Sequence, residues 1–204
     1  AGTVDLSDDN FAEPSSFIEA HFARQARFAR TRFGAAAYFE SARFDGHAEF
    51  RDAYFSGVAS FKDAVWGDNA VFAGVRFDQR ALFWRARFLA QADFTAVRAD
   101  GEFSCNGAVF ADRADFADFT FAQAAHFADV TFDQAAFQGS YFRKEADFSG
   151  VEARALHFLS FFSQTLDLRH TVVGTLDLRP DTGADSTFAQ HAQVYLQQSY
   201  FDRV

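Results

Sequence analysis

The stretch FIEAHFARQARFARTRFGAAAYFESARF, residues 17–44, decides the fold, because phenylalanine returns in it at intervals of five and six residues. The series starts at Phe17 and continues past the stretch through Phe50, Phe55 and Phe61. Two intervals make an undecad, and a small residue, usually Ala, stands two positions before most of these phenylalanines. A period this regular indicates an internal repeat.

The same register extends to both sides of this stretch. Backwards it reaches Leu6, close to the start of the chain. Only five residues separate Phe132 from Phe137 where six are due, so one residue has been dropped from the repeat. From Phe148 to Leu178 the centre positions all fall five apart, which predicts shorter coils in this part of the chain.

Helical and extended conformations make different predictions for this spacing. An 11-residue period is also that of a right-handed helical supercoil. In an α-helix, however, a spacing of five places successive phenylalanines about 140° apart, so they could not share one apolar stripe. In a strand, residues two apart point to the same side. Short strands joined by corners bury all the rings only by winding around a common axis, which predicts an all-β solenoid.

This motif of a small residue, a polar one, a central Phe and two turn residues resembles that of the pentapeptide-repeat family. The resemblance covers roughly residues 4–180, and it implies a right-handed quadrilateral β-helix with four repeats per coil. A coil would take about 22 residues where the spacing alternates. We assign eight phenylalanines to its structural core: Phe22, Phe44, Phe55, Phe77, Phe88, Phe110, Phe121 and Phe132.

Two centre positions hold small residues in place of Phe, and large residues nearby suggest that the lost volume is compensated. Ala99 and Cys105 stand where the register expects Phe. Phe103 and Phe119 occupy positions that are small elsewhere. Since protein interiors tolerate few voids, we predict that each large residue fills the space beside a deficit.

The end of the repeat is marked by Pro180, which cannot donate a ladder hydrogen bond, and by the turn-rich residues after it. We predict a solenoid over residues 1–180, then a loop and a short C-terminal capping α-helix within residues 181–204. Ser186 would cap this helix, with Tyr195 and Ser199 on its buried face. The helix would cover the open end, or mediate a homodimer as similar segments do in the family.

Composition and charge narrow the function classes. The chain has 30 Phe, no Met, a single Cys and a net charge of −9, which argues against a basic nucleic-acid-binding surface. No apolar run approaches the length of a membrane helix, so we expect no membrane insertion by this segment and a cytoplasmic location. The absence of Met suggests a piece of a longer protein, or removal of the first residue.

No catalytic, cofactor-binding or metal-ligating constellation emerges from the sequence. The six His residues are dispersed, no glycine-rich phosphate loop is present, and Cys105 lies at an inward position without a His placed to activate it. We therefore expect no enzyme activity and no cofactor.

Charged residues form columns when the chain is folded at about 22 residues per coil. Acidic residues gather near one corner and on a neighbouring face, and we assign them to a candidate interaction surface. Arginines form columns on two opposite faces. The acidic residues are Asp45, Asp68, Asp112 and Asp133 at the corner, and Asp93 and Asp115 on the face.

The sequence therefore leaves two functions open. The first is a non-catalytic scaffold that binds an unidentified protein partner through the flat faces of a rigid rod. The second follows from the resemblance, because quinolone-resistance members of the family imitate the acidic surface of a DNA duplex and bind DNA gyrase. The arginine columns weaken that imitation.

Overall fold

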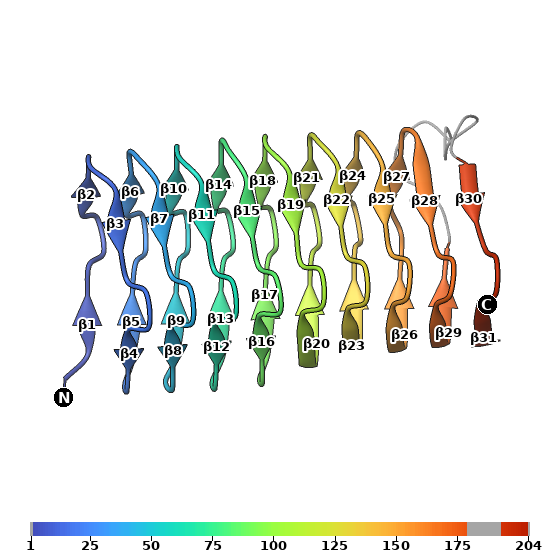
Figure 1. The fold of residues 1–204 in the computed structure, drawn as a ribbon, viewed down its shortest axis with the longest axis horizontal. Helices are drawn as coiled ribbons and strands as arrows, with labels where there is room; N and C mark the ends of the chain where they lie inside the picture. The colour runs from blue at the N-terminus through green and yellow to red at the C-terminus, as the bar shows by residue number, and fades with distance from the viewer. Residues whose placement is uncertain (1, 179–192, 204) are drawn as a thin grey trace.

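The computed structural model describes residues 2–178 and 193–203. In this part the chain winds into a parallel β-solenoid whose coils follow one another along a single axis (Figure 1). Each coil gives one short strand to each of four faces, and every strand pairs in parallel with its equivalents in the neighbouring coils. The all-β solenoid predicted from the phenylalanine spacing is confirmed, and so are the four sides that the family resemblance implies.

Face 1 and face 2 follow each other along the chain. Face 1 contains β1 (Val4–Asp5), β5 (Ala26–Arg27), β9 (Ala48–Glu49), β13 (Ala70–Val71), β17 (Ala92–Asp93) and the C-terminal halves of β20 (Val109–Asp115), β23 (Thr131–Ala136), β26 (Glu152–His157) and β29 (Val172–Asp177). Face 2 contains β2 (Asn10–Phe11), β6 (Arg32–Phe33), β10 (Tyr54–Phe55), β14 (Arg76–Phe77), β18 (Arg98–Ala99), β21 (Thr120–Phe121), β24 (Tyr141–Phe142) and β27 (Phe161–Phe162).

Faces 3 and 4 complete each coil. Face 3 contains β3 (Ser15–Ser16), β7 (Ala37–Tyr38), β11 (Ala59–Ser60), β15 (Ala81–Leu82), β19 (Phe103–Ser104), β22 (Ala125–His126), β25 (Ala146–Asp147), β28 (Thr165–Asp167) and β30 (Gln193–Tyr195). Face 4 contains β4 (His21–Phe22), β8 (Arg43–Phe44), β12 (Val65–Trp66), β16 (Arg87–Phe88), the N-terminal halves of β20, β23, β26 and β29, and β31 (Tyr200–Arg203).

The register between coils reproduces the spacing of the sequence. Phe55 pairs with Phe77, one full coil of alternating intervals further along the chain, whereas Phe121 pairs with Phe142 across a coil that is one residue shorter. A register shift in the pairing of β20 with β23 marks the residue dropped before Phe137. Phe142 pairs with Phe162 across a still shorter coil. The constant spacing of five places Ser163 at this centre, which is wrong by one residue, because Phe162 is buried and Ser163 is exposed. The shortening changes which outward residues lie above one another.

Phenylalanine rings fill the centre of the solenoid in columns. Phe50 and Phe72 stack with ring centroids 4.8 Å apart and planes 3° apart, one coil above the other. Rings on adjacent faces meet edge to face, as Phe44 and Phe50 do at 6.0 Å and 78°. All eight phenylalanines assigned to the core are buried. Stacking and edge contacts add to the free energy of burying each ring.

In the intervals of five residues where the spacing alternates, the second residue after the central one lies at a corner with positive φ. Ser41 and Asp63 have φ of 56° and 57°, and Gly74 has φ of 71°. Left-handed backbone turns the chain sharply, and it is accessible to Gly at no steric cost. The alternation of five and six residues therefore corresponds to an alternation of tight and wider corners around the coil.

The predicted compensation of volume is observed in the core. Phe103 lies between Phe83 and Phe127, at centroid distances of 5.5 and 5.9 Å. Its ring fills the place that Cys105 leaves in the column of rings behind face 3. Phe119 stacks on Phe121 at 3.8 Å and 5°. The other face of the Phe121 ring carries Phe142 at 4.5 Å, so Phe119 lies on the side of Ala99.

The predicted C-terminal helix is wrong for residues 193–203; its remaining part lies outside the described residues. Residues 193–195 and 200–203 form β30 and β31, which pair with β28 and β29. Tyr195 and Tyr200 favour extended backbone, and the free edges of β28 and β29 offer hydrogen-bond partners that a helix would leave unpaired. The parallel strand pairing of the solenoid therefore continues beyond Pro180.

Candidate interaction surfaces

Outward side chains form columns on each face, one residue per coil. In a two-residue strand one side chain enters the core and the other points to solvent, so strand pairing aligns the outward ones about 4.8 Å apart. The surface chemistry of the solenoid is therefore set by residues that lie a whole coil apart in the sequence.

The acidic corner predicted from the sequence is divided between two adjacent columns. Asp45 lies below Gly67, and Leu89 occupies the same column one coil above Gly67. Asp68 and Asp112 belong to the neighbouring column, with Ala90 between them. Asp133 follows at the register shift between β20 and β23. The structure thus interrupts the acidic surface with Leu89, which is 44% exposed.

Two of the four corner aspartates have cationic partners. Asp45 lies 2.6 Å from His21 Nε2 and accepts a hydrogen bond of 2.5 Å from Arg43. Arg154 donates two hydrogen bonds of 2.7 and 2.8 Å to Asp133. These hydrogen bonds favour the charged carboxylate, so His21, then Arg43, lowers the pKa of Asp45, and Arg154 lowers the pKa of Asp133.

The other two corner aspartates are not compensated. Asp68 and Asp112 each accept a hydrogen bond of 2.7 Å from the backbone N–H of the next residue. Among residues 2–178 and 193–203 neither carboxylate forms an ion pair. The negative charge left at this corner is therefore carried mainly by these two residues.

The predicted acidic face is present on face 1. Asp93 and Asp115 pair in register, with Val71 and Glu49 in the coils below. Arg113 Nη2 donates a hydrogen bond of 2.7 Å to Asp115, whereas Asp93 accepts bonds from Thr95. The pair is thus partly neutralised within its own face.

Face 2 carries the predicted arginine column, interleaved with Tyr54. The side chains of Arg32 and Arg76 each lie 6.0 Å from the centre of the Tyr54 ring. Arg76 forms ion pairs with Asp78 and Asp100, at 2.7 and 3.1 Å. These contacts form a network across four coils, in which positive and negative side chains alternate in place of a uniform positive charge.

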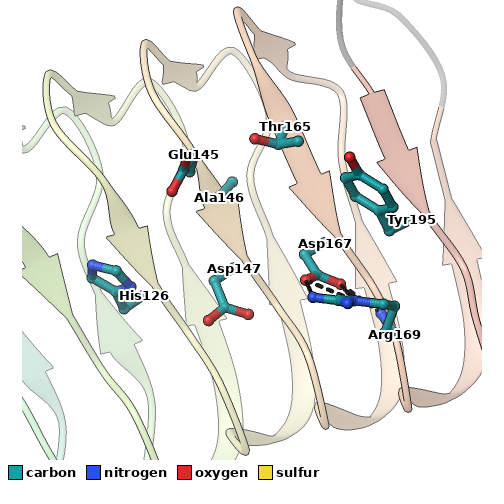
Figure 2. Close-up of a pocket in the computed structure, with 8 residues that line it drawn as sticks. All are labelled: His126, Glu145, Ala146, Asp147, Thr165, Asp167, Arg169 and Tyr195. Carbon is teal, nitrogen blue, oxygen red and sulfur yellow. Dashed lines mark hydrogen bonds and ion pairs between the residues drawn. The ribbon is translucent and has the colours of Figure 1, made fainter.

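A groove that the sequence analysis missed lies on face 3, over the strands β22, β25, β28 and β30 (Figure 2). Its volume is about 440 Å³. His126, Asp147, Asp167 and Tyr195 succeed one another along its floor, because strand pairing places each above the last. The sequence interval between them differs from one coil to the next, so folding the numbering at a constant period could not align them.

The groove carries an excess of negative charge, and the ring of Tyr195 forms one of its walls. Glu145, Asp147 and Asp167 contribute carboxylates, and Arg169 contributes the one guanidinium among the lining residues. Arg169 donates hydrogen bonds of 2.5–3.0 Å to Asp167, which lower the pKa of that carboxyl, and its guanidinium lies 5.6 Å from the centre of the Tyr195 ring. Glu145 is exposed and forms no ion pair within the described residues, so it is open to a partner (Figure 2).

The described residues contain no cluster of His, Cys, Asp and Glu that could hold a metal ion. Burial raises the pKa of the Cys105 thiol well above its usual value, so the thiol stays protonated and is a poor nucleophile. Residues 2–178 and 193–203 also hold no helix with the length and apolar character needed to span a membrane.

Comparison with known proteins identifies the repeat. Residues 10–53, 39–87 and 50–98 match the family model described as pentapeptide repeats (9 copies). No curated protein matches the chain, and no solved structure does. The strand pairing continues through β29 with the same four-sided coil, beyond the matched residues.

Proposed function

We propose that this chain, which is a pentapeptide-repeat protein, is a non-catalytic scaffold that binds a protein partner through the groove on face 3. The parallel ladder fixes the outward side chains of every coil, so the rod presents its surface with little conformational freedom to lose on binding. Solenoid proteins commonly use such extended surfaces to bind other proteins.

The groove is the observation that carries this proposal. Concave surfaces remove more water from a bound group than flat ones, and the hollows beside Arg113 on face 1 are smaller, at about 310 and 220 Å³. Tyr195 offers an aromatic surface, and the carboxylates of Glu145 and Asp147 complement a basic side chain of the partner.

Site-specific cross-linking tests the groove directly. A photoreactive amino acid replaces Thr165, which lines the groove, and in a matched protein it replaces Gln25 on face 1, which is similarly half-buried. We expect a saturable cross-link to a partner in extracts of the source cells from position 165 and none from position 25. Glu145→Lys should abolish the cross-link. Equal labelling from both positions, or no labelling, would refute the assignment.

A second candidate function is modulation of DNA gyrase by duplex imitation, supported by the uncompensated carboxylates of Asp68 and Asp112. Gyrase supercoiling would be measured with the parent chain, with Asp68→Ala/Asp112→Ala, and with the control Asp45→Ala/Asp133→Ala, whose carboxylates are already paired. Inhibition that is lost only in the first variant supports imitation. Unchanged supercoiling with the parent refutes it.

A further inference from the structure

An exposed aromatic pair lies on face 2, away from the groove. Tyr141 in β24 pairs with Phe161 in β27, and both side chains point outward while Phe142 and Phe162 enter the core. The Tyr141 and Phe161 rings stack with centroids 4.8 Å apart and planes 12° apart. Tyr141 is 45% exposed, and its hydroxyl has no hydrogen-bond partner among the described residues.

Two free cations follow Tyr141 along the chain. Arg143 and Lys144 are exposed, and within residues 2–178 and 193–203 neither side chain forms an ion pair or hydrogen bond. By contrast, Arg76 and Arg98 on the same face are bound to aspartates, as in the 2.7 Å pair between Arg98 and Asp100. Arg32, also on face 2, lies against the Tyr54 ring, whereas Arg143 and Lys144 contact neither an aspartate nor a ring among the described residues.

We propose that Tyr141, Phe161, Arg143 and Lys144, here called the Tyr141 patch, bind an extended acidic segment of a partner protein. An apolar side chain of that segment packs against the edges of the stacked rings, and its carboxylates bind the two cations. The combination of an apolar centre and an unpaired charged edge is typical of the energetically important part of an interface.

The geometry of β24 specifies the pattern of the segment. Arg143 directly follows Phe142, the last residue of β24, so the Cα atoms of Tyr141 and Arg143 lie at most about 7 Å apart. Alternate residues of an extended partner have the same spacing, so an acidic residue two positions from an apolar one matches the patch.

An acidic protein segment fits this chain better than a nucleic acid does. Two unpaired cations release few counterions from a phosphate backbone, and the net charge of −9 repels it at long range. The stacked rings lie on face 2 and the groove lies on face 3. Lys144 adjoins Glu145 of the groove, so Tyr141→Ser is the variant that tests the patch without changing a neighbour of a groove residue.

Fluorescence anisotropy with defined ligands tests the patch. The ligands are a labelled peptide with the sequence Glu-Ser-Leu-Ser repeated three times, the same peptide with Gln in place of Glu, and a labelled ten-residue oligothymidylate. We expect the parent chain to bind the Glu peptide at least tenfold more tightly than the Gln peptide. Arg143→Glu/Lys144→Glu should weaken that binding at least tenfold, and Tyr141→Ser severalfold.

A matched control separates the patch from net charge. Arg24 and Arg80 are exposed, form no ion pair among the described residues and lie elsewhere on the solenoid, so Arg24→Glu/Arg80→Glu changes the net charge equally. We expect this variant to bind like the parent, with circular dichroism showing that all variants are folded. Equal weakening in the control, no preference for Glu over Gln, or binding of the oligothymidylate in place of the peptide would overturn the proposal.

Discussion

Moving one ring within the core gives a stringent test of how this solenoid is packed. Phe119 occupies the side of the Phe121 ring that faces Ala99. Ala99 stands where the column of rings behind face 2 would otherwise hold a phenylalanine. Exchanging the two residue types, by Ala99→Phe together with Phe119→Ala, returns the ring to its regular position and leaves the volume of the core unchanged.

The single changes and the double change have different expected effects. Phe119→Ala removes a fully buried ring that also meets Phe103 at 5.0 Å, and we expect it to lower the free energy of unfolding by about 3–5 kcal/mol. Ala99→Phe adds a ring to a filled space, and we expect a loss of about 1–3 kcal/mol. The double variant should lie within about 1–2 kcal/mol of the parent, because the ring and the space again match.

Urea unfolding of the four proteins measures the coupling between the two sites. The midpoint of Phe119→Ala should fall by roughly 1 M or more, and that of the double variant should largely recover. Circular dichroism and tryptophan fluorescence must give coincident transitions for these free energies to be comparable. If the two losses simply add, to within about 0.5 kcal/mol, Phe119 does not occupy the space beside Ala99 and the compensation is refuted.

The same geometry gives three further predictions. Ala96 has φ of 56° and is exposed, so Ala96→Gly should relieve left-handed strain and raise the free energy of unfolding by up to about 1 kcal/mol, measured by urea denaturation; a lower midpoint would contradict this. Phe83→Ala, in the middle of a column, should cost about 3–5 kcal/mol in the same assay, and an unchanged midpoint would place the ring outside the core. The hydrogen bonds from Arg85 lower the pKa of Asp63 below its ordinary value. This ion pair therefore adds to the free energy of unfolding at a pH above the unfolded-state pKa of Asp63, and its contribution is lost as the pH falls through the folded-state pKa. Asp63→Asn should therefore flatten the acid dependence of the midpoint, which an unchanged dependence would disprove.

Most of the fold was predictable because it depends on local spacing. The interval of five or six residues specifies which side chains enter the core, and the dropped residue before Phe137 specifies where the register shifts. The C-terminal helix was mispredicted because a cap residue and a helical pattern were weighed without the free edges of β28 and β29. Those edges exist only once the preceding coils have formed.

The candidate surfaces were predictable only in part. Asp93 and Asp115 align as expected, because the coil keeps its full length there. Asp45 lies one column away from Asp68, and the groove along Asp147 and Asp167 escaped detection, because small changes in coil length shift the alignment. The partners of Asp45 and Asp133 also depend on side-chain conformations that spacing does not specify.

The amino-acid sequence thus specifies the winding of this chain and the content of its core, since the burial of a phenylalanine every five or six residues leaves the backbone one compact path. The surface, by contrast, is specified by the folded chain. Residues in successive coils become neighbours according to the length of each coil, and their charges are neutralised or left free according to those neighbours. Binding sites on this solenoid arise from that accumulated register, which no single repeat contains.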